Sequence, residues 1–72
     1  MNLTTPKTPN MYRANIKAGL EVDIVLKKDQ RTGKLTRGIV KHILTSAALH
    51  TRGIKVQLTS YQIGRVQHII SK

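Results

Sequence analysis

The sequence lacks cysteine, phenylalanine and tryptophan, and only three of its 72 residues are acidic. Because there is no cysteine, neither a disulfide framework nor a thiolate metal site can stabilise the fold, and the composition fits a reducing cytoplasm. No stretch approaches the roughly 20 apolar residues of a membrane span, and residues 1–15 contain no apolar run like that of a signal peptide. These absences predict a cytoplasmic protein that does not span a membrane.

The few acids also leave no catalytic constellation. Glu21 and Asp23 alternate with apolar residues and are expected on the solvent face of a strand. Asp29 is expected to form an ion pair with Lys28 or Arg31. The three histidines are too few and too dispersed for a metal site. We therefore expect no enzymatic activity, no cofactor and no small-molecule substrate.

Positive charge is the strongest feature of the composition. The chain carries 13 Lys and Arg residues and a formal net charge of +10 at pH 7. Residues 30–72 contain no carboxylate side chain that could pair with the cations there. Charge that the fold cannot neutralise internally favours an anionic partner, and nucleic acid is the commonest cellular polyanion. An acidic protein, a membrane surface, or no charged partner at all are the alternatives.

Alternation of apolar and polar side chains predicts four short strands. They cover residues 20–27, 35–44, 54–59 and 64–69. The second and the fourth contain the same six-residue pattern, G-x-V-x-H-I. Ile43 is apolar where strict alternation would place a polar residue, so a bulge is expected near Lys41 and His42.

The connections between these strands are polar. The loop at 28–34 has no apolar residue, and we expect Gly33 to adopt a positive φ there. The connection at 45–52 has room for a single helical or 3₁₀ turn around Ala47. Residues 60–62 form a tight link between the last two strands.

Glycines stand at or just before the start of each predicted strand, where a small curled sheet needs sharp bends. The length suits one small domain. We therefore predict an all-β fold, a small SH3-like or OB-like curled antiparallel barrel of four to five strands over residues 15–72. Residues 1–14, which contain both prolines, are predicted to be a flexible N-terminal extension. The expected core is Leu20, Val22, Ile24, Leu26, Val40, Ile43, Ile54, Val56, Leu58, Val66 and Ile69.

Nine residues are candidates for contact with nucleic acid. Three cations are expected as a cross-strand row on the outer face, an arrangement that is unfavourable without an anion. Five more belong to a basic finger around the first loop, and Tyr61 could stack on a base or merely cover one end of the barrel. The row is Lys41, Lys55 and Arg65, and the finger is Lys27, Lys28, Arg31, Lys34 and Arg37.

Only two tyrosines are available for stacking, so readout of exposed bases is less favoured than contact with the phosphates and shape of RNA. The leading hypothesis is a non-enzymatic RNA-binding module. The alternative is a protein-interaction module that presents a strand edge, or the loop at 28–37, to an acidic partner. Whether the domain is a monomer or a dimer is left open by the sequence.

Several motifs resemble the YwbE-like family of small uncharacterised bacterial proteins. They are IKAGLEVDIVLKKDQRTGKLTRGIVKHILT at 16–45, GIKV at 53–56 and GRV at 64–66. The stretch DQRTG at 29–33 is the most specific of them, and the resemblance covers residues 15–70. It implies a compact, cytoplasmic, all-β domain and supplies no activity, ligand or catalytic residue.

The chain departs from the pattern of this family in three turns. Ala18 and Thr51 stand where proline is expected, and Ser60 and Tyr61 occupy a turn that is expected to contain glycine. The departures concern the geometry of the turns and leave the strand motifs unchanged.

Overall fold

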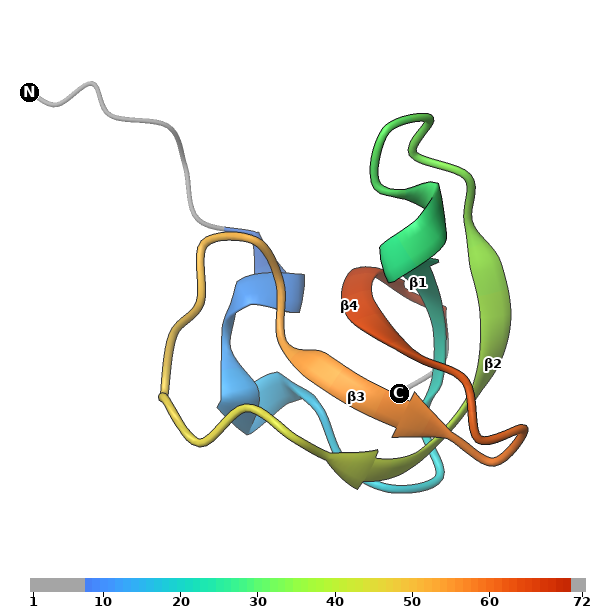
Figure 1. Ribbon diagram of the computed structural model, residues 1–72. Helices are drawn as coiled ribbons and strands as arrows, with labels where there is room; N and C mark the ends of the chain where they lie inside the picture. The colour runs from blue at the N-terminus through green and yellow to red at the C-terminus, as the bar shows by residue number, and fades with distance from the viewer. Residues whose placement is uncertain (1–7, 71–72) are drawn as a thin grey trace, which may run out of the picture.

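The computed structural model of the chain describes residues 8–70 and shows a closed antiparallel barrel of four strands. The elements are η1 (Pro9–Met11), η2 (Arg13–Asn15), β1 (Glu21–Leu26), η3 (Lys27–Asp29), β2 (Thr36–Ile43), β3 (Lys55–Leu58) and β4 (Ile63–Ile69) (Figure 1). The three η elements are single 3₁₀ turns. The predicted all-β barrel is thus confirmed, with four strands. Among the described residues, no helix is long and apolar enough to cross a membrane.

Strand β1 closes the barrel because it pairs with both β2 and β4. Val22 lies opposite Gly38 on one side and Ile69 on the other. Between β2 and β3 the register shifts between Val40 and His42, which confirms the predicted bulge. A second irregularity lies on the β1–β4 side. These breaks add local twist, which helps four short strands to curl into a closed cylinder.

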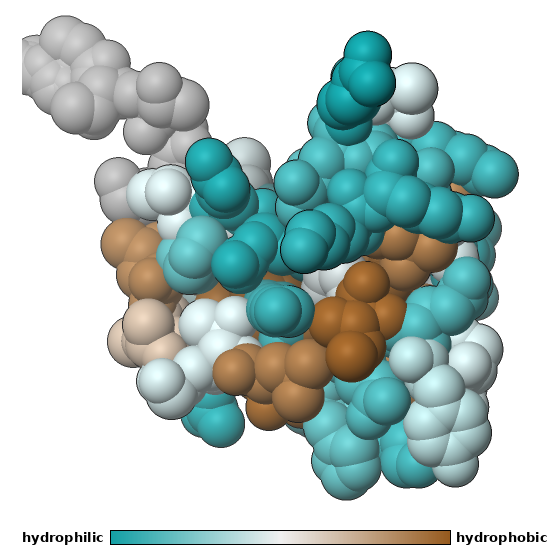
Figure 2. Space-filling view, viewed as in Figure 1, coloured by the Kyte–Doolittle hydropathy of each residue, from teal (hydrophilic) through white to brown (hydrophobic). Residues whose placement is uncertain are grey.

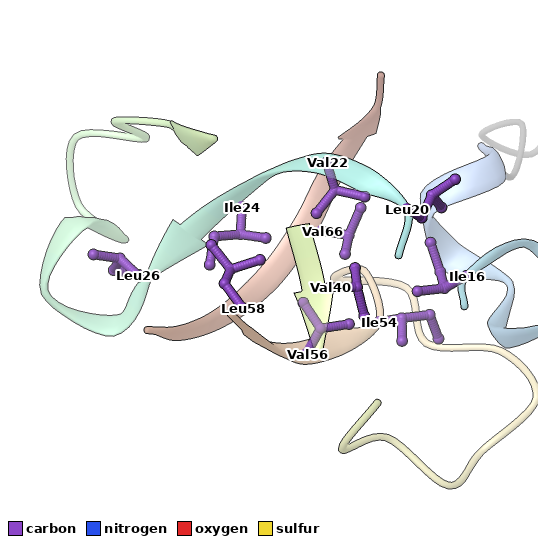
Figure 3. Close-up of a cluster of buried hydrophobic side chains, with 10 residues drawn as sticks. All are labelled: Ile16, Leu20, Val22, Ile24, Leu26, Val40, Ile54, Val56, Leu58 and Val66. Atoms are coloured by element: carbon purple, nitrogen blue, oxygen red, sulfur yellow. The ribbon is translucent and has the colours of Figure 1, made fainter. Parts of the chain in front are cut away.

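The inward side chains of all four strands form one core (Figure 3). Nine of the eleven predicted core residues are buried, while Ile43 and Ile69 are only partly buried and pack against the others. Ile16, which the prediction left out, is also buried. The buried set is Ile16, Leu20, Val22, Ile24, Leu26, Val40, Ile54, Val56, Leu58 and Val66.

The N-terminal segment is tied to the barrel at Asn10. Asn10 is buried, its Nδ2 donates a hydrogen bond to the Val66 carbonyl at 2.9 Å, and its carbonyl accepts one from the Ile54 amide at 3.0 Å. A buried amide needs such partners, and the segment therefore has a defined place. The predicted flexible extension over residues 1–14 therefore includes one residue, Asn10, that packs against the barrel, and its part at 1–7 lies outside the described residues.

The connection at 45–52 contains bends instead of the suggested helical turn. Leu49 forms an isolated antiparallel bridge with Tyr12, and the Arg13 amide donates to the Ala48 carbonyl at 2.9 Å. These backbone groups bond to the N-terminal segment, so they are not available for a local helical turn.

Gly53 and Gly64 allow close approach between strands. A Cβ on Gly53 would lie 2.2 Å from the Val66 carbonyl oxygen, and one on Gly64 would lie 2.4 Å from the Val25 carbonyl oxygen. Gly53 also has a φ of +98°. Gly33 has the expected positive φ of +74°, but a Cβ there would meet no atom within 4 Å.

Asp23 points outward from β1, yet only 5% of it is exposed, so its predicted place on the solvent face is wrong. Arg37 and His68 lie directly opposite on the two neighbouring strands and flank it. The Asp23 carboxylate accepts two hydrogen bonds from Arg37, from Nε at 2.8 Å and from Nη2 at 3.1 Å. These bonds hold the pKa of Asp23 below its ordinary value, against the opposing effect of burial, with a smaller contribution from His68.

Gly33 and Gly53, two of the three positive-φ glycines among the described residues, give a matched test of backbone packing. Gly33→Ala is expected to cost about 1 kcal/mol, the penalty of an L residue in a left-handed conformation. Gly53→Ala carries the same penalty and also forces the Val66 carbonyl to move, so we expect it to cost at least about 2 kcal/mol more. Urea denaturation followed by circular dichroism would measure both. Equal losses would contradict the close approach at Gly53.

The ion pair of Asp23 predicts a stability that depends on pH. Because the folded-state pKa of Asp23 lies below its ordinary value of 3.8, the contribution is complete above pH 3.8 and is lost as the pH falls through the folded-state pKa. Asp23→Asn should lower the free energy of unfolding at neutral pH by about 1 kcal/mol, because the exposed guanidinium is screened by solvent. Denaturation measured from about pH 7 to about pH 2 should show that the free energy of unfolding falls less with acid in the variant than in the wild type. If the variant lost as much stability in acid as the wild type, the ion pair of Asp23 and Arg37 would not be the source of the pH dependence.

Candidate nucleic-acid interface

A polar groove lies over the outer face of β4. The loop between β1 and β2 and the connection between β2 and β3 stand on either side of this strand (Figure 1). Two adjoining depressions, of about 400 and about 340 Å³, share Val25, Gln30 and Arg65 in their linings. We call them together the β4 groove, lined by Val25, Lys27, Gln30, Gly33, Arg52, Lys55, Ile63, Gly64, Arg65 and Gln67.

Figure 2 shows this face of the molecule, with hydrophilic residues gathered on both sides of the hollow in its upper part and a hydrophobic strip below. Four of the lining residues are Lys or Arg, and none is acidic. The groove is therefore a concave surface of one charge sign, which concentrates anions.

Alternation along β4 explains why its side chains line the groove. Gly64 and Val66 are buried, whereas Ile63, Arg65 and Gln67 point outward. Arg65 lies directly opposite Lys55 on β3. Two like charges in directly opposed positions repel each other, so this pair is destabilising until an anion binds.

Hydrogen bonds to the β2–β3 connection fix the outward side chains of β4. Arg65 Nη1 donates to the Gly53 carbonyl at 3.2 Å, and Gln67 Nε2 donates to the Arg52 carbonyl at 3.3 Å. Each bond uses one N–H of the side chain, so Arg65 keeps further N–H groups for a ligand. The bonds also place Arg52 at the wall of the groove.

The predicted row of three cations is wrong at Lys41. Lys55 and Arg65 do lie side by side, but the bulge in β2 shifts Lys41 out of register with them. The Lys41 Nζ lies 4.0 Å from the centre of the Tyr61 ring, a cation–π contact. Lys41 is therefore not part of the β4 groove.

The basic finger is divided in the structure. Lys27 lines the groove, whereas Lys28, Arg31 and Lys34 are exposed on the β1–β2 loop and do not line it. The sequence suggested that cations after residue 30 have no internal partner, and for Arg37 this is wrong because it pairs with Asp23 across β1 and β2.

Asp29 also differs from its prediction. Among the described residues it forms no ion pair with Lys28 or Arg31, and its Oδ2 is buried without a hydrogen-bond partner. Within residues 8–70, no three His, Asp or Glu side chains lie close enough together to hold a metal ion.

Tyr61 lies in the β3–β4 turn with 66% of its surface exposed. Its φ is +70°, in the left-handed region where residues other than glycine are uncommon. The ring contacts the Lys41 ammonium, and it is not among the lining residues of the groove. Stacking on a base therefore remains a prediction for Tyr61, separate from the groove.

Sequence reasoning missed three polar residues of the groove. Gln67 was within reach, because it lies two residues after Arg65 on the same face of β4. Gln30 and Arg52 lie on connections far apart in the chain, and only the closed fold brings them together. No periodic signal in the sequence could have selected them.

Residues 9–69 match the family DUF2196, described as an uncharacterized conserved protein. The uncharacterized protein YwbE of Bacillus subtilis (strain 168) is 61% identical over 59 residues, which cover 82% of this chain and 91% of YwbE. No solved structure matches the chain. The match extends over the whole barrel and confirms the resemblance predicted from the strand motifs. The chain therefore belongs to the DUF2196 family and is YwbE-like.

Proposed function

We propose that the domain is a cytoplasmic, non-enzymatic RNA-binding module that holds the phosphate backbone in the β4 groove. The observation that carries this proposal is the directly opposed pair of Lys55 and Arg65, both of which line a groove whose lining includes no acid. An anion between the two side chains removes their repulsion. Binding would therefore stabilise the fold as well as hold the ligand.

The chemistry of the lining favours the backbone of RNA over its bases. Contacts from Lys and Arg to phosphate fix the position of a nucleic acid and are independent of its sequence. None of the lining residues is aromatic, so the groove offers no platform on which a base can stack. We therefore expect little preference among RNA sequences.

The alternative partner, an acidic protein, has less support. Addition of a strand from a partner needs an open edge, but each of the four strands of the described barrel is paired on both sides. The exposed loop at 28–37 is the part of that hypothesis that the fold leaves possible.

Binding to RNA should weaken steeply with salt. Four cations line the groove, and each phosphate that is neutralised contributes about −0.7 to the slope of log affinity against log salt for a single strand. We expect a slope of about −2 to −3 for a labelled oligoribonucleotide, measured by fluorescence anisotropy from about 50 to about 300 mM KCl. Affinity that does not change over this range would exclude binding through phosphates.

A pair of charge reversals tests the location. Lys55→Glu should weaken RNA binding by about tenfold or more, because it puts a carboxylate beside the bound phosphate. Lys17→Glu makes the same change in charge at an exposed lysine that does not line the groove, and should change affinity by less than about threefold. Thermal melts should show both variants folded. Equal losses from the two would mean that the groove is not the contact surface.

A further inference from the structure

One end of the β4 groove has the properties of a preformed site. It is the depression of about 400 Å³ between the β1–β2 loop and the β2–β3 connection, and Arg52 and Arg65 both line it. Two guanidinium groups in one concavity suit a phosphate, because each planar fork can donate two hydrogen bonds to its oxygens.

Arg65 is held in place before any ligand arrives. Its side chain is partly buried, and Nη1 is fixed on the Gly53 carbonyl at 3.2 Å. Gly53 itself cannot shift easily, because a φ of +98° and the nearby Val66 carbonyl fix its backbone. A side chain that is already ordered loses less conformational freedom when it binds.

Arg52 is held by its backbone and keeps its side chain free. Its carbonyl accepts the hydrogen bond from Gln67 at 3.3 Å, and its amide donates to His50 Nδ1 at 3.2 Å. In the part of the chain that the structure describes, its exposed guanidinium has no hydrogen-bond or ion-pair partner. All of the N–H groups of its guanidinium are therefore available to a ligand.

The opposite wall supplies room and a polar group. Gly33 lines the pocket and has no side chain, and the space where its Cβ would stand is open. Gln30 contributes an amide that can donate a hydrogen bond. The Asp29 carboxylate does not line either depression.

We propose that Arg52 and Arg65, supported by Gln30, form a phosphate subsite at one end of the groove. Lys27 and Lys55 line the adjoining depression, and Arg65 belongs to both, so a second phosphate on the same strand lies next to the first. This inference rests on the proposed function. It makes the ligand a phosphodiester chain with at least two successive phosphates, in preference to free phosphate or a mononucleotide.

Nuclear magnetic resonance on the full-length protein tests the subsite. The probes are inorganic phosphate, uridine monophosphate, and oligouridylates of two and of eight nucleotides that each carry a 5′-phosphate, so that the shorter one has two successive phosphates. The amide signals of Gly33 and Gly53 report on the subsite, and that of Lys55 reports on the adjoining depression. We expect all three signals to move with the oligouridylates, and affinity to rise at least tenfold from the monophosphate to the longer chain.

Variants at Arg52 separate this site from general attraction of charge. Arg52→Gln removes a side chain that makes no internal hydrogen bond, and should weaken the eight-nucleotide probe at least tenfold while the fold is kept. Arg52→Lys keeps the charge but lacks the planar guanidinium fork, and its affinity for this probe should lie between those of the wild type and Arg52→Gln. Arg31→Gln is the matched control, because it removes the same charge from an exposed loop position outside the groove, and should change affinity less than threefold.

The outcomes distinguish the subsite from the proposed function. If Arg52→Gln and Arg31→Gln behave alike while Lys55→Glu still weakens binding, the subsite is wrong and RNA binding stands. If no oligouridylate binds the wild type, both the proposed function and the arrangement of two successive phosphates in the groove are wrong. If phosphate or uridine monophosphate binds as tightly as the longer chain in an Arg52-dependent way, the pocket takes a free phosphate and the assignment to RNA is overturned.

Discussion

Pairing of β1 with both β2 and β4 is the constraint on which the rest of the structure depends. It turns four short strands into a closed surface, so that every second residue of β1 points into the core. Val22 and Ile24 are completely buried for this reason. The same closure determines which side chains of β4 face outward, and the pairing of β3 with β4 places Arg65 opposite Lys55. The fold and the candidate site therefore both follow from the pairing of the four strands in one closed sheet.

Closure also decides which charges are neutralised. Asp23 lies on the middle strand of three, where Arg37 can reach it from the neighbouring strand. The groove over β4 has no comparable acid in its lining. Four cations therefore line the groove without an acid beside them, while Lys17, Lys28, Arg31 and Lys34 are exposed outside it. The groove is the basic surface to which the fold gives a concave shape.

The sequence predicted the barrel well because its signal is local. Alternation locates the strands, and the apolar Ile43 locates the bulge. The failures have nonlocal causes. Asn10 is buried by contacts that a segment without periodicity does not reveal, and Asp23 is covered by neighbours on other strands. The groove was predicted in part, because alternation places residues on a face of one strand but does not say which loops will stand beside it.

The two partners that close the barrel are far apart in the chain. Val22 pairs with Ile69, 47 residues later, so most of the chain must be synthesised before the cylinder can be completed. Until β4 emerges from the ribosome, β1 has an unpaired edge and the inward valines and isoleucines have no final partner. Nonlocal pairing of this kind folds slowly and exposes nascent chains to aggregation. Slow closure is therefore the expected consequence of a barrel whose first and last strands are neighbours.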